Sequence, residues 1–78
     1  MPTVLRLLNW RFHFYSDEGS EPPHIHVDIG DGECKFWLSP VRLARAARIK
    51  ARELREIEAV VIDREAFFLE KWHEFFAR

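Results

Sequence analysis

The first half of the chain alternates apolar and polar side chains with the period of two that is typical of β-strands. A first strand is predicted over residues 10–15, where Trp10, Phe12 and Phe14 share one face. Two further strands are predicted over 24–29 and 33–38, separated by Gly30-Asp31-Gly32. Because Asp-Gly favours a two-residue type I′ turn, we expect a hairpin with Asp31 and Gly32 at its tip.

This turn sets the register of the hairpin. The inward-facing pairs are then all apolar: Ile29 with Cys34, Val27 with Phe36, and Ile25 with Leu38. The outward-facing pairs are Asp28 with Lys35, His26 with Trp37, and His24 with Ser39. Because a slip of one residue would place Ile opposite Lys, the turn and the hydrophobic pattern agree. We therefore expect a cross-strand ion pair between Asp28 and Lys35.

The second half of the chain changes to the period of an α-helix. From Ala51 onward, apolar residues recur on one face: Leu54, Ile57, Val61, Phe68, Trp72 and Phe75. Residues 51–78 contain no glycine or proline, so the pattern fits one long helix or two helices that break near Asp63. Ser39-Pro40 is a suitable N-cap and first helical residue, so we expect a short helix over 41–47, with an extended strand as the alternative.

These patterns predict an α+β fold in a single domain over residues 1–78, with strands within 3–38 and helices within 40–77. The sheet is expected to have three antiparallel strands around the central Asp-Gly hairpin, with the C-terminal helices packed on one face. The expected core joins both halves of the chain: Trp10, Phe12, Phe14, Ile25, Val27, Ile29, Cys34, Phe36 and Leu38 against Leu54, Ile57, Val61, Phe68 and Trp72. Further apolar residues widen the helical face, and we expect part of that face to be buried in a homodimer: Val60, Phe67, Leu69 and Phe76.

Composition and charge indicate the compartment and the ligands that we expect for this protein. Cys34 is the single cysteine of the 78 residues, so no intramolecular disulfide forms, which favours the reducing cytoplasm. The N-terminus lacks the pattern of a signal peptide, and no apolar run is long enough for a membrane span. The formal net charge of −1 argues against strong overall attraction to nucleic acid. One segment is nevertheless basic: Arg42, Arg45, Arg48, Lys50, Arg52 and Arg55.

The strongest candidate site is Pro22-Pro23-His24-Ile25-His26-Val27. In a strand, His24 and His26 point from the same face, roughly 7 Å apart. Histidine titrates near neutral pH, so such a pair suggests proton transfer, metal binding or anion contact. The predicted binding face carries further polar and aromatic residues: Arg11, His13, Tyr15, His24, His26, Lys35 and Trp37.

Three functions fit this face. Trp37, Tyr15 and His26 would form a platform for a protein partner or for single-stranded nucleic acid. Alternatively, His24 and His26 would be the acid and base of metal-independent RNA cleavage. Metal binding is the third function, but two imidazoles are too few for zinc, and a third ligand would have to come from His13. We therefore expect neither a metal site nor a cofactor, with binding ranked above catalysis.

Several segments resemble one family of small bacterial proteins. They are Phe14-Tyr15-Ser16, Pro22-Pro23-His24-Ile25-His26-Val27 and Gly32-Glu33-Cys34-Lys35-Phe36-Trp37-Leu38. The likeness also includes Met1-Pro2-Thr3, Arg52-Glu53-Leu54-Arg55-Glu56-Ile57 and Trp72-His73-Glu74-Phe75-Phe76. This family is a domain of unknown function, DUF4160, and Pro-Pro-His-x-His is its most specific motif.

The resemblance implies a compact stand-alone domain whose gene often lies beside that of a small DUF2442 protein, an arrangement that suggests a toxin–antitoxin pair. On this basis we expect a small interaction protein of such a pair, with a DUF2442-type partner and RNA as a further possible ligand. Many family members carry an additional histidine or a third proline in the loop before the motif, where this chain has Glu18-Gly19-Ser20-Glu21. If that additional histidine is a metal ligand or a catalytic residue in other members, this chain lacks it.

Overall fold

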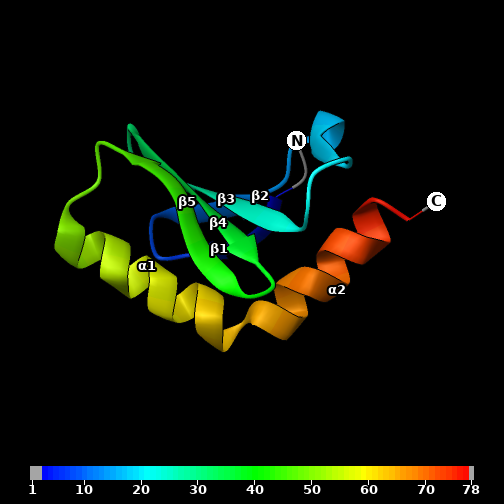
Figure 1. The fold of residues 1–78 in the computed structure, drawn as a ribbon. Coiled ribbons are helices and arrows are strands. Elements are labelled where there is room, and N and C mark those ends of the chain that lie inside the picture. Colours follow the sequence, from blue (N-terminus) through cyan, green and yellow to red (C-terminus); the bar gives the residue numbers. More distant parts are fainter. Residues whose placement is uncertain (1–2, 78) are drawn as a thin grey trace.

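The computed structural model describes residues 3–77, which form an antiparallel sheet followed by two α-helices (Figure 1). The strands are β1 (Thr3–Leu7), β2 (Trp10–His13), β3 (His24–Ile29), β4 (Gly32–Leu38) and β5 (Val41–Ala47). Each strand pairs with the next, in the order β1-β2-β3-β4-β5. The helices are α1 (Ala51–Asp63) and α2 (Glu65–Phe75). The predicted α+β fold is confirmed, but the prediction of three strands is wrong, because the sheet has five.

The two additional strands lie at the edges of the sheet. The helix that we predicted over 41–47 is strand β5, and Ser39-Pro40 lies in the turn between β4 and β5. The prediction rested on Ser39-Pro40 as a helix start, and the extended strand that we kept as the alternative is the one observed. Alanine and arginine are also good helix formers. Pairing with β4 from Glu33 to Leu38 overrides this local preference. The pairing shifts between Lys35 and Phe36, where a bulge leaves Ala44 without a partner on β4.

The central hairpin is present, but its tip is Gly30-Asp31 and not Asp31-Gly32. Ile29 pairs with Gly32, and Gly30 has a φ of +57°. A type II′ turn needs a positive φ at its first central residue, where glycine carries no steric penalty. Gly32 instead belongs to β4, and a side chain there would collide with the backbone carbonyl of Arg48.

The shifted tip moves the register by two residues, so every side chain keeps its predicted face but changes its partner. The inward pairs are Val27 with Cys34 and Ile25 with Phe36. The outward pairs are Asp28 with Glu33, His26 with Lys35, and His24 with Trp37. The predicted ion pair between Asp28 and Lys35 is therefore wrong. Asp28 instead binds Arg11 of β2, with Arg11 Nη2 2.9 Å from its Oδ2 atom.

The C-terminal region forms two helices, which settles the alternative that the sequence left open. Arg64 separates them with φ −112° and ψ 23°, while its N–H still donates to the Val60 carbonyl. The bend lets both helices cover the same sheet face, where the Phe12 and Phe68 rings stack with centroids 5.3 Å apart. The predicted core is confirmed, with Leu54 at its half-buried margin.

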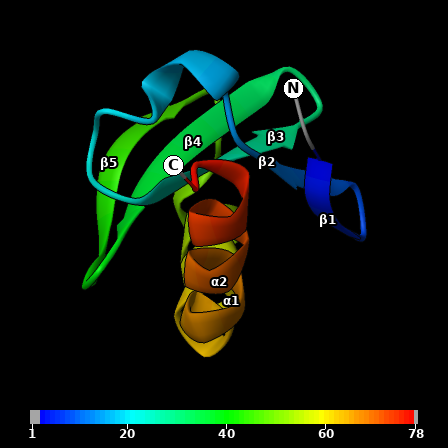
Figure 2. The ribbon, with the colours of Figure 1, turned by 90° about the vertical axis from the view of Figure 1, so that its right-hand side faces the viewer.

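The sheet is covered on one face by the helices and in part on the other face by a loop. The α-helices lie beneath it, while the loop between β2 and β3 crosses the opposite face (Figure 2). The apolar residues that we assigned to a homodimer pack in part against the core of this chain: Val60, Phe67, Leu69 and Phe76. The homodimer thus stays a prediction, and these apolar residues no longer support it. Among residues 3–77, neither helix has the length and apolar character required to cross a membrane.

Candidate functional site

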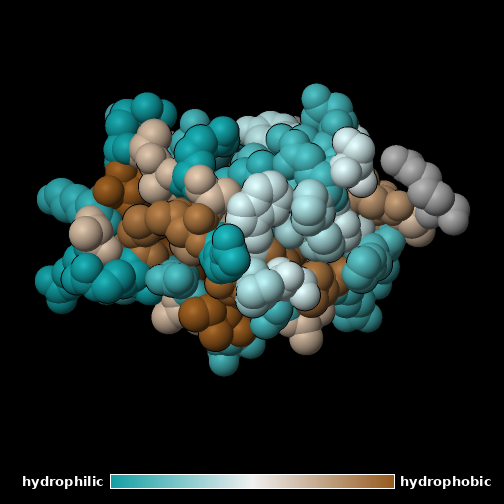
Figure 3. Space-filling model, in the orientation of Figure 1, coloured by the Kyte–Doolittle hydropathy of each residue, from teal (hydrophilic) through white to brown (hydrophobic). Residues whose placement is uncertain are grey.

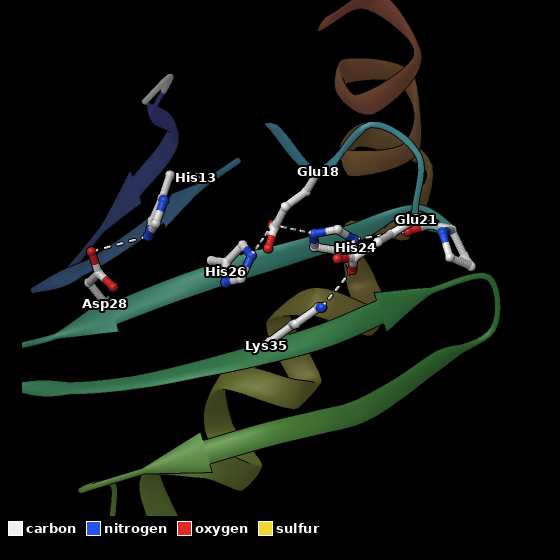
Figure 4. A network of polar contacts seen from close by, with 8 residues as sticks. His13, Glu18, Glu21, His24, His26, Asp28 and Lys35 are labelled. Atoms are coloured by element: carbon white, nitrogen blue, oxygen red, sulfur yellow. Dashed lines mark hydrogen bonds and ion pairs between the residues drawn. The ribbon is translucent and has the colours of Figure 1, made fainter. Parts of the chain in front are cut away.

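His24 and His26 both project from the outward face of β3, as the alternation predicts. Their side chains are nevertheless almost fully buried, with relative exposures of 0% and 3%. The loop over residues 16–23 folds back across them and closes the face (Figure 4). The carbonyl of Pro23 accepts a hydrogen bond from the Leu38 N–H, which holds the end of this loop against β4. The Pro-Pro-His-x-His motif therefore marks an enclosed site.

Glu18 provides the third polar group of this site. It ends the short 3₁₀ turn η1 (Ser16–Glu18), whose backbone is fixed by a hydrogen bond from the Glu18 N–H to the Tyr15 carbonyl. A single carboxylate atom, Oε1, lies 2.8 Å from Nε2 of His24 and 2.7 Å from Nε2 of His26. Figure 4 shows Glu18 descending from the loop between the two imidazoles.

The protonation of His24 is constrained by its second nitrogen. Nδ1 lies 2.9 Å from the Pro22 carbonyl oxygen, which only accepts, so Nδ1 must carry a proton. A neutral His24 then presents a bare lone pair at Nε2, facing the lone pairs of Glu18. Two acceptors 2.8 Å apart need a hydrogen or a metal ion between them.

A second layer of charges lies next to this cluster. Lys35 Nζ is 2.8 Å from Oε1 of Glu21, and the same carboxylate atom is 3.7 Å from Nδ1 of His24. Lys35 Nζ also lies 4.5 Å from the centre of the Trp37 ring, a favourable cation–π position. Lys35 and Trp37 thus lie beside the cluster and do not form an open stacking platform with Tyr15 and His26.

His13 extends the buried polar region away from Glu18. Its ring stacks on His26 with centroids 5.6 Å apart, and Tyr15 meets both rings edge-on. His13 Nε2 lies 3.1 Å from Oδ2 of Asp28, but the contact is not aligned as a hydrogen bond. Neither ring nitrogen of His13 has a hydrogen-bond partner among residues 3–77. His13 lies outside the group of converging ligand atoms that the structure forms.

Burial controls the acid–base properties of the site. It lowers the pKa of His13 and of His26, because a buried imidazolium loses its hydration, and nearby carboxylates oppose this only in part. Burial alone would raise the pKa of Glu18, but the hydrogen bonds from His24 and His26 outweigh it and lower that pKa. Glu18 is therefore a carboxylate at neutral pH.

Sequence reasoning missed Glu18, although a signal was present. The loop over 16–23 is too long for a tight turn between neighbouring antiparallel strands. Since the helices occupy one face of the sheet, a long loop that packs against the sheet is expected on the other face. Its acids, Asp17, Glu18 and Glu21, were the available third ligands.

The resulting cluster has the donor set of a metal site. One ligand atom from each of Glu18, His24 and His26 lies within 4.8 Å of the other two. Two imidazoles and one carboxylate are found in open sites for zinc and for non-haem iron. Our expectation of no metal site did not consider the loop carboxylate of Glu18 as the third ligand.

The same residues lie within a recognised family segment. The model of a domain of unknown function, DUF4160, matches residues 9–73, which include the whole cluster and most of the chain. The protein belongs to the DUF4160 family. No curated protein and no solved structure matches the chain. The predicted toxin–antitoxin pairing, its DUF2442-type partner and the RNA ligand stay predictions.

Proposed function

We propose that this protein binds a divalent first-row transition-metal ion through Glu18, His24 and His26. The observation that carries the proposal is the closeness of three ligand atoms. Oε1 of Glu18 lies within 2.8 Å of both Nε2 atoms, and one ligand atom of each residue lies within 4.8 Å of the other two. The orientation of His24 supports it as well. Metal-binding histidines usually donate their other N–H to a carbonyl or carboxylate, and His24 donates to the Pro22 carbonyl.

A metal ion would need slightly longer distances between the ligand atoms than those in the structure. Ligand atoms about 2.1 Å from a tetrahedral ion lie roughly 3.4 Å apart. The observed nitrogen–oxygen distances are 2.7 and 2.8 Å, so each has to lengthen by about 0.6–0.7 Å. Glu18 lies on a loop and is 23% exposed, so its side chain has room to move. Because the ligand atoms of the three residues spread over up to 4.8 Å, the imidazole rings also have to turn toward the ion.

Three protein ligands leave at least one coordination position open. A bound ion would use that position for water or for a small anionic group, and it would polarise whatever binds there. Glu18 supplies one negative charge, and His24 and His26 are neutral when they coordinate. The protein site thus carries less charge than the ion, which favours an anionic group at the open position.

The metal proposal ranks above RNA cleavage by His24 and His26 alone because both Nε2 atoms face Glu18. Neither ring has enough exposed surface to reach a 2′-hydroxyl while the loop is closed. A general base has to lie within hydrogen-bond reach of the proton that it removes. The predicted role in a toxin–antitoxin pair is the binding of a partner protein. That role is compatible with a metal site in the same chain.

Titration with Co²⁺ tests the proposal, because cobalt bound by nitrogen and oxygen ligands absorbs visible light. We expect saturation at one ion per chain with untagged protein, and at least about 100-fold weaker binding for His24→Ala, His26→Ala and Glu18→Ala. The matched control is His73→Ala, since His73 is exposed on α2 and far in sequence from the cluster. Binding that depends on His73, or that is equal in all four variants, would overturn the proposal.

A further inference from the structure

A second candidate site lies next to the Pro-Pro-His-x-His motif, at the end of the β4–β5 hairpin. It is a cavity of about 200 Å³ lined by Pro22, Pro23, Trp37, Ser39, Pro40 and Arg42. This volume is below the roughly 300–1,000 Å³ of sites for drug-sized ligands, so it suits a single ring system. The surface around this end of the hairpin has intermediate hydropathy. It is the pale region that extends toward α2 in Figure 3.

The walls of this cavity suit a flat aromatic group. Trp37 is half-buried on the outward face of β4, and three proline rings surround it. Aromatic side chains in such positions stack on nucleobases with little regard to base identity. The other two tryptophans, Trp10 and Trp72, are buried in the core. Trp37 is thus the tryptophan in contact with the cavity.

The rim of the cavity suits a phosphate. Arg42 pairs with Trp37 across the strands, and Arg45 pairs with Lys35 two residues further along β4. Two residues of strand span roughly 7 Å, so Arg42 and Arg45 form a short row of cations on the outward face. Both arginines are exposed, and neither forms an ion pair with another residue of the 3–77 range.

We propose that the cavity at Trp37 and Arg42 binds a nucleotide unit, with the base stacked on Trp37 and the phosphates on Arg42 and Arg45. The charge of strand β5 supports an anionic ligand, because residues 41–52 contain no Asp or Glu. The Glu21 carboxylate also lies near Trp37, but it is paired with Lys35. The same chemistry fits a free mononucleotide or one nucleotide of a single strand. The site uses none of the three proposed metal ligands, so it is independent of the metal proposal.

Intrinsic tryptophan fluorescence in EDTA tests this site, because a stacked base quenches Trp37 while Trp10 and Trp72 stay shielded. The probes are UMP, a uridine hexamer RNA and the corresponding deoxyuridine hexamer. We expect quenching by the hexamers and a log–log salt slope of about −1.4, which corresponds to two phosphate contacts on a single strand. A response to UMP at similar concentration would assign the site to free nucleotides.

The variants are chosen so that folding is preserved. Arg42→Ala and Arg45→Ala change exposed side chains and should each weaken binding about tenfold. Arg55→Ala is the matched control, because Arg55 is an exposed cation on α1, away from the outward sheet face. Trp37→Phe should abolish the quenching while circular dichroism is unchanged.

The proposal is overturned if none of the probes quenches wild type at millimolar concentration in low salt. It is also overturned if Arg42→Ala and Arg45→Ala bind as well as wild type, or if a proline-rich acidic peptide binds and the nucleotides do not. Because EDTA removes any metal, a failure here leaves the cobalt titration unaffected.

Discussion

Replacing Glu18 by alanine should destabilise the metal-free protein strongly, although Glu18 lies in a loop. The substitution removes both hydrogen bonds at 2.7 and 2.8 Å and leaves two buried imidazole nitrogens without a partner. Hydrogen bonds to a charged group contribute about 1.5–3 kcal/mol each, and the 23% exposure of Glu18 reduces this contribution. We expect a loss of about 2–4 kcal/mol in the free energy of unfolding, a large share of the stability of so small a domain.

Urea and thermal unfolding followed by circular dichroism, with EDTA present throughout, measure this loss. For a domain of this size the expected decrease in Tm is roughly 10–20 °C. Glu18→Gln keeps the shape and one acceptor oxygen, so its loss should be about half as large. The control is Asp17→Ala, which removes an exposed acid from the same 3₁₀ turn. If Glu18→Ala were as stable as Asp17→Ala, the loop would not be held by the histidines, and the account of the site would be wrong.

Three further predictions concern the rest of the fold. Gly32→Ala should cost about 2 kcal/mol in urea unfolding, because its methyl group would collide with the Arg48 carbonyl; wild-type stability would contradict the register. Burial raises the pKa of Cys34 to about 12, so a thiol reagent at pH 8 should label it only after denaturation, and rapid labelling of native protein would contradict its burial. Burial lowers the pKa of His13 below its ordinary value of 6.5. As the pH falls, the unfolded chain therefore binds a proton at this residue before the folded chain does. The free energy of unfolding should then decrease as the pH drops below about 6.5. In metal-free protein His13→Asn should show a smaller loss between pH 7.5 and 5.5, and an unchanged loss would assign the effect to other groups.

The sequence identified the parts of the fold whose patterns are set by burial. Alternation placed Trp10, Phe12 and Phe14 in the core, and helical spacing did the same for Ile57, Val61, Phe68 and Trp72. These predictions succeeded because a side chain on the wrong face would lose its apolar contacts. The positions of His24 and His26 on a shared face followed from the same periodicity.

The errors arose where several local solutions satisfy the same pattern. Moving the hairpin tip from Asp31-Gly32 to Gly30-Asp31 shifts the register by two and leaves every face unchanged, so the hydrophobic pattern could not distinguish the two. Strand β5 consists of good helix formers, and only its pairing with β4 makes it extended. Glu18 contacts the histidines from a loop, and a loop has no regular spacing of apolar residues from which the contact could be predicted.

Metal content is the most direct test of the central claim. Untagged protein is dialysed against excess Zn²⁺, then against metal-free buffer, and its zinc is measured by elemental analysis. We expect one zinc ion per chain for wild type and for His73→Ala, and a small fraction of that for His24→Ala and for Glu18→Ala. Wild-type protein that leaves the dialysis without zinc would contradict the claim that Glu18, His24 and His26 form a metal site.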